Sequence, residues 1–91
     1  MDRQRLTERL TERFDADPAR ARVVARAAGD LADSGRYAAD FQTSLTIDVV
    51  LANLRDAPDD STVDERWNWW MGALELSHGG YSQFDVRQSA V

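Results

Sequence analysis

The chain has 91 residues, 43% apolar and 30% charged, and this size and composition predict a single globular domain spanning residues 1–91. Eleven arginines stand against 16 acidic residues, which gives a formal net charge of −5. The lack of cysteine excludes a disulfide scaffold and a thiol enzyme, a single histidine argues against a zinc site, and no apolar run is long enough to cross a membrane.

The charged residues are unusual in kind and in distribution. All basic residues are arginine, and aspartate outnumbers glutamate by 12 to 4. This composition resembles that of proteins from salt-adapted microbes, although codon bias alone would produce it too. Residues 1–26 hold seven arginines and five acids, whereas residues 27–91 hold four arginines and eleven acids. The polar start of the chain lacks the apolar stretch of a secretory signal, so we expect a cytoplasmic protein.

The first two elements are predicted to be helices. Leu6, Leu10 and Phe14 recur every four residues and form one apolar row over residues 3–14. Asp17 is a good N-cap residue and Pro18 fits the first helical position of a second, alanine-rich helix that runs to residue 33. This second helix is expected to stop at Gly35.

The middle of the chain gives a weaker pattern. Tyr37 and Phe41 lie four residues apart, which is enough for one or two helical turns. A helix over residues 47–57 follows the apolar template, with a cap among residues 43–46 and Pro58 at its end. Residues 43–49 also fit an alternating strand, but no partner strand is evident, so we favour helix.

The last helix has the clearest signals. Thr62 and Glu65 form a capping-box pattern, and the helix should run to Ser77 and stop at the glycine pair 79–80. The following tail is expected to be extended and packed on the bundle, with residues 86–91 frayed. The sequence therefore predicts an all-α protein, a compact bundle of four to five short helices with an extended C-terminal tail.

The predicted core collects the apolar residues that share a face on these helices. Its members are Leu6, Leu10, Phe14, Val24, Leu31, Phe41, Val50, Leu51, Leu54, Trp67, Trp70, Met71 and Leu74.

The tryptophan-rich helix is apolar on two sides. At about 100° per residue, Trp67 and Trp70 share the core side, whereas Trp69 and Leu76 fall on the opposite side. That second side must be covered by other helices of the chain, by the tail aromatics Tyr81 and Phe84, or by a second protein. We predict an interaction surface that also contains two small residues and that supports a homodimer; its members are Trp69, Gly72, Ala73 and Leu76.

These features favour a small cytoplasmic protein-interaction module, an adaptor or regulatory subunit, with no catalytic residue, cofactor or metal site. An alternative is a nucleic-acid-associated regulator that contacts phosphates through Arg5, Arg9 and Arg13, although Glu8 and Glu12 beside them neutralise much of the field and make nucleic acid a weaker expectation. A third is a ligand-binding domain or small enzyme around His78, with Glu75 three residues away as its partner. The acidic stretch 56–65 lacks the spacing of a calcium loop.

Overall fold

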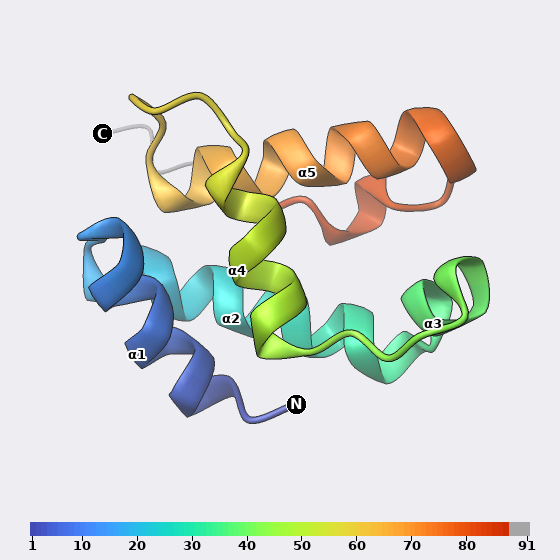
Figure 1. Cartoon of the computed structure of the whole chain (residues 1–91), viewed down its shortest axis with the longest axis horizontal. Helices are drawn as coiled ribbons and strands as arrows, with labels where there is room; N and C mark the ends of the chain where they lie inside the picture. Colours follow the sequence, from blue (N-terminus) through green and yellow to red (C-terminus); the bar gives the residue numbers. More distant parts are fainter. Residues whose placement is uncertain (88–91) are drawn as a thin grey trace.

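The computed structural model describes residues 1–87, which form five α-helices and one 3₁₀ turn, with no strand in that range. The helices are α1 (Arg3–Phe14), α2 (Pro18–Ser34), α3 (Arg36–Phe41), α4 (Ile47–Arg55) and α5 (Val63–His78), and the turn is η1 (Ser82–Phe84). The all-α prediction is therefore confirmed, and so is the choice of helix over strand for the segment that begins at residue 47 (Figure 1).

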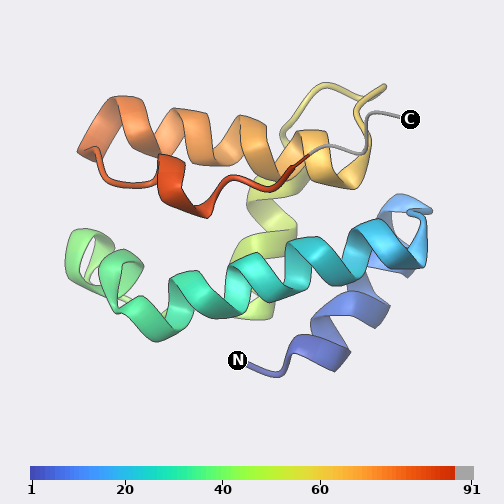
Figure 2. The ribbon, with the colours of Figure 1, turned by 180° about the vertical axis from the view of Figure 1, so that it is seen from behind.

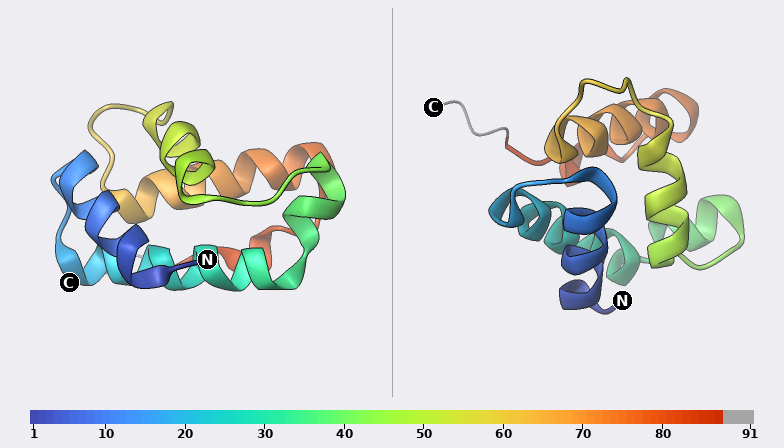
Figure 3. Two further views of the ribbon diagram at one scale, coloured as in Figure 1. Left: turned by 60° about the horizontal axis from the view of Figure 1, so that its bottom comes forward. Right: turned by 60° about the vertical axis from the view of Figure 1, so that its left-hand side comes forward.

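The two longest helices, α2 and α5, form two layers that the shorter helices hold together. Helix α1 packs on α2, and α4 spans from the level of α5 to that of α2 (Figures 1 and 3). After α5 the chain turns back, and η1 lies between α2 and α5 (Figure 2). The tail is therefore a packed part of the domain rather than an appendage.

Local capping signals place most helix ends where the sequence predicts them. The Asp17 carboxylate accepts a hydrogen bond from the backbone N–H of Ala19 at 3.0 Å, and Gly35 ends α2 in the left-handed conformation with φ of 73°. Thr46 caps α4 by accepting from the N–H of Val49. Helix α4 ends at Arg55 rather than at residue 57, so the predicted end is two residues too late.

The predicted core is largely correct, with two exceptions among its aromatic residues. Phe14 is only half-buried, and Phe41 is exposed. In the six-residue helix α3, Tyr37 occupies the inward position, and the Phe41 ring stacks on it one turn further along, at the edge of the bundle. Leu45 and Tyr81 are buried core members that the sequence analysis missed.

Arg66 is a buried cation whose hydrogen-bond partners within residues 1–87 are backbone carbonyls rather than carboxylates. The residue is 8% exposed, and its guanidinium donates hydrogen bonds to four backbone carbonyls. These belong to Leu54 at 3.0 Å, Asp59 at 3.1 Å, Ser61 at 3.3 Å and Ala57 at 3.5 Å. One side chain thus satisfies the C-terminal end of α4 and the loop that leads to α5. The half-buried ring of Phe14 lies 4.9 Å from the same guanidinium carbon and adds a cation–π contact from α1.

A second arginine ties α1 to α2. Arg3 reaches across α2 and pairs with Asp33 at 2.9 Å and with Asp30 at 3.3 Å. Gly29 makes this path available, because a Cβ at that position would collide with the Arg3 guanidinium. Both ion pairs are largely solvated, so they orient α1 more than they stabilise the fold.

Arg66→Lys should lower the free energy of unfolding by about 2–4 kcal/mol, because one ammonium group cannot reach carbonyls that the planar guanidinium spans and the unmet oxygens stay buried. Urea denaturation measures the difference. Arg55→Lys, at an exposed position on α4, is the matched control and should change stability by less than about 0.5 kcal/mol. Equal effects of the two substitutions would show that the carbonyl contacts of Arg66 do not matter.

Candidate functional site

Two of the three tryptophans in the run from Trp67 to Trp70 form the centre of the core. Both rings are buried and meet edge to face, with centroids 5.6 Å apart and planes at 83°. Trp70 also meets Tyr37 of α3 edge to face, with centroids 6.1 Å apart. The predicted core side of α5 is confirmed, and its role is to join α5 to the rest of the bundle.

The first two residues of the run also hold the tail by its main chain. The indole N–H of Trp67 donates to the carbonyl of Phe84 at 2.9 Å. The side-chain amide of Asn68 donates to the carbonyl of Val86 at 2.9 Å and accepts from its N–H at 2.8 Å, as a neighbouring strand would. Val86 is therefore anchored to α5. Of the residues expected to fray, 88–91 lie outside the described residues.

Glu75 binds the start of the tail. Its carboxylate accepts from the backbone N–H groups of Ser82 at 2.8 Å, Tyr81 at 2.9 Å and Gly80 at 3.2 Å. These hydrogen bonds, that of Ser82 foremost, hold the pKa of the Glu75 carboxyl below its ordinary value. The sequence analysis proposed His78 as the partner of Glu75, and the structure gives the carboxylate these backbone partners instead.

His78 lies at the exposed end of α5. Its ring packs against the ring of Phe41, with centroids 4.6 Å apart, and its Nδ1 atom is 2.8 Å from the hydroxyl of Ser77. With Glu75 committed to the tail backbone, the structure does not bring His78 and a carboxylate together as an acid–base pair.

Tyr81 anchors the tail by its side chain. It is fully buried, and its hydroxyl donates to the Asp40 carboxylate at 2.7 Å. Burial, reinforced by this hydrogen bond, raises the pKa of the Tyr81 phenol. Tyr81 and Phe84 thus pack on the inner side of α5, and the tail aromatics do not cover the opposite side.

That opposite side of α5, formed by Trp69, Gly72, Ala73 and Leu76 and here called the outer face, is open within the described chain. Trp69 is 43% exposed and Leu76 is 91% exposed. A Cβ built on Gly72 would have no heavy atom outside its own helix neighbourhood within 4 Å. The structure therefore groups the four predicted interaction residues on one accessible surface.

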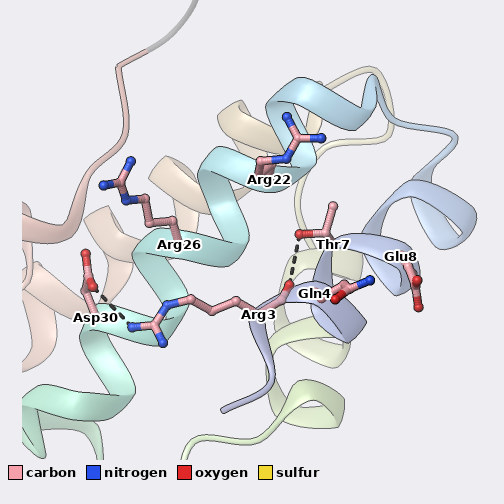
Figure 4. A pocket seen from close by; sticks show the side chains of 7 residues that line it. All are labelled: Arg3, Gln4, Thr7, Glu8, Arg22, Arg26 and Asp30. Atoms are coloured by element: carbon pink, nitrogen blue, oxygen red, sulfur yellow. Dashed lines mark hydrogen bonds and ion pairs between the residues drawn. The ribbon is translucent and has the colours of Figure 1, made fainter.

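The arginines do not form a single basic face. A groove of about 710 Å³ lies between α1 and α2, with Arg22 and Arg26 along the α2 side and Arg3 reaching across to Asp30 (Figure 4). Gln4, Thr7 and Glu8 line the α1 side, whereas Arg5, Arg9 and Arg13 are not among the lining residues. At about 100° per residue, Arg5, Arg9 and Arg13 fall on a different side of α1 from the groove-lining residues Gln4, Thr7 and Glu8.

The ion pairs found within residues 1–87 are those of Arg3 with Asp30 and Asp33 and one between Arg55 and Asp56. Groups of three or more residues suited to hold a metal ion are absent from that range, and no helix in it could span a membrane.

These features define a small all-helical domain built around a tryptophan-rich helix. The chain belongs to the WNWW domain family, whose pattern it matches over residues 1–75. The family name spells the residues from Trp67 to Trp70, which the structure places at the junction of core, tail and outer face. No curated protein and no solved structure matches the chain.

Glu75→Gln should loosen the start of the tail, because a neutral amide oxygen accepts backbone hydrogen bonds more weakly than a carboxylate. At neutral pH the amides of Tyr81 and Ser82 should exchange their hydrogens faster than in wild type. Glu12→Gln removes the same charge from an exposed position on α1 and should leave these rates unchanged.

The pH dependence of this effect has a defined sign. Because the folded-state pKa of Glu75 lies below the ordinary value of 4.5, its contribution to stability is complete above 4.5 and is lost as the pH falls through the folded-state value. Asp85 acts in the opposite sense, since burial and then the charge of Glu75 raise its pKa. The stability difference between wild type and Glu75→Gln should therefore shrink in acid, and a difference that grows would contradict the assignment.

Proposed function

We propose that the chain is a small protein-interaction module, an adaptor or regulatory subunit of the cytoplasm, that binds through the outer face of α5. The polar groups of Glu75, Tyr81 and Trp67 make hydrogen bonds inside the domain that hold the tail in place. Because these groups stabilise the fold, they support a binding role over a catalytic one. The separation of the arginines supports a protein partner over a nucleic acid. The cysteine-free composition agrees with a cytoplasmic location.

The observation that carries this proposal is the exposed glycine at position 72, in the middle of α5. Glycine inside a helix costs about 1 kcal/mol relative to alanine, and Gly72 has neither a positive φ nor a close neighbour that would require it. The described chain therefore offers no reason for glycine at this position. Close approach by the backbone of a partner helix would supply one, because only a small residue leaves the necessary space.

The order of residues on the outer face favours a second copy of the chain as the partner. In an antiparallel pair of α5 helices with its twofold axis between positions 72 and 73, Trp69 meets the partner's Leu76 and Gly72 meets the partner's Ala73. Two small residues then lie at the centre, where the backbones come closest, and large apolar residues fill the space on either side. An isologous interface needs this kind of self-complementary order.

Opposite effects on folding and association test the proposal. Gly72→Ala should raise the free energy of unfolding by about 0.5–1 kcal/mol at dilutions where the monomer dominates. Gly72→Leu and Trp69→Ala should each weaken self-association in sedimentation experiments, by about 2 kcal/mol or more for the tryptophan, with helical content retained.

Ala52→Leu, at an exposed position of α4, is the matched control and should leave association unchanged. Wild-type protein that stays monomeric at millimolar concentration would rule out the second copy as partner. Association that Gly72→Leu and Trp69→Ala both leave intact would rule out the outer face.

A further inference from the structure

The outer face of α5 presents no charged side chain along its centre. Between Arg66 and His78 the helix has one charged residue, Glu75, and its carboxylate binds three successive backbone N–H groups that follow the helix. Arg66 is itself buried and donates to backbone carbonyls. At about 100° per residue, the next charged residue on the outer side is the exposed Glu65, one turn before Trp69. Two copies that pair over the outer face therefore meet without ion pairs at the centre of their contact.

The charge of the whole chain opposes that pairing. Sixteen acidic residues against eleven arginines leave a net charge of −5 on each copy. Exposed acids are found on α4 and on the loop that leads to α5; they are Asp48, Asp56, Asp59 and Asp60. The outer face has no arginine to offset them, because the one arginine of α5 is the buried Arg66. Association must therefore overcome a like-charge repulsion that the contact itself does not neutralise.

The size of the domain decides the salt concentration at which this repulsion acts. The domain measures 25 Å and 21 Å along its two shorter axes, so the centres of two paired copies lie roughly 20–25 Å apart. The Debye length is about 30 Å at 0.01 M salt and about 8 Å at 0.15 M salt. Repulsion between the net charges thus reaches across the pair in dilute salt and is largely screened at 0.15 M. Coulomb's law with this screening gives an affinity that changes about tenfold between the two salt concentrations.

We propose that ionic strength controls self-association through the outer face: dilute salt keeps the copies apart as monomers, and salt near 0.15 M or above lets them pair. This control rests on the proposed function, because it needs a second copy on the outer face. It depends on the concentration of mobile ions and not on a bound ion, so sodium chloride and potassium chloride act alike at equal ionic strength. An interface held by ion pairs would respond in the opposite sense, since salt screens attraction as well as repulsion.

Sedimentation equilibrium of the wild-type chain in sodium chloride measures the effect. The dissociation constant of the dimer should fall about tenfold between 0.01 M and 0.15 M salt. Potassium chloride at the same ionic strengths should give the same values. A dissociation constant that rises with salt, or that does not change, would overturn the proposal.

Two substitutions of opposite sign test whether net charge is the cause. Asp60→Asn and Arg13→Gln change exposed residues that form no ion pair within residues 1–87, and they bring the net charge to −4 and −6. Because repulsion scales with the product of the two net charges, at 0.01 M salt Asp60→Asn should tighten association about threefold and Arg13→Gln should loosen it about threefold. At 1 M salt both variants should match wild type. Shifts in the same direction, or shifts that persist at 1 M salt, would contradict control by net charge.

Trp69→Ala, measured in the same salt series, separates this proposal from the proposed function. If wild type associates equally well at both salt concentrations and Trp69→Ala does not associate, the outer face is the interface and the control by salt is wrong. If wild type stays monomeric at millimolar concentration in both salts, self-association is wrong and the control by salt fails with it. Association that follows salt as expected and is lost in Trp69→Ala supports both.

Discussion

The arrangement of the domain depends on the guanidinium of Arg66. It satisfies carbonyls from the end of α4 through the following loop, and Phe14 brings α1 against the same group. A buried carboxylate partner would have required the desolvation of a second charge. The four backbone carbonyls bring no second charge, and they accept hydrogen bonds from four of the five N–H donors of the guanidinium. Because this contact fixes where α5 starts, it also fixes where each face of α5 points.

The geometry of a helix explains why the four residues that name the family have different environments. Successive side chains are rotated by about 100°, so four consecutive residues surround the helix and cannot share one side. Trp67 and Trp70 are buried together, Asn68 binds the tail backbone, and Trp69 is left on the outer face. A compact motif in the sequence is therefore a set of contacts in several directions, joined only by the helix that carries them.

Features that depend on neighbouring residues could be predicted from the sequence, and those that depend on distant ones could not. Asp17 and Gly35 act within a turn of the helix they cap, and the spacing of Trp67 and Trp70 fixes a common side. Arg66 looks like any charged helix residue until the path of the preceding loop is known. Helical spacing likewise gave Glu75 a partner on its own helix, because nothing local shows that the tail returns to it. Phe41 is exposed because the short helix α3 places it at the edge of the bundle, a position that helical periodicity in the sequence does not reveal.

The difference in burial between Trp69 and the other two tryptophans allows the state of the domain to be followed by its intrinsic spectroscopic signals. Trp67 and Trp70 meet edge to face in a buried setting, so their electronic transitions should couple and dominate the near-ultraviolet circular dichroism while the core is intact. Trp69 is partly solvated and should contribute the red edge of the fluorescence emission. Quenching by a dissolved collisional agent would then act mainly on Trp69, and the loss of that quenching would report coverage of one side of α5 without any label attached to the protein.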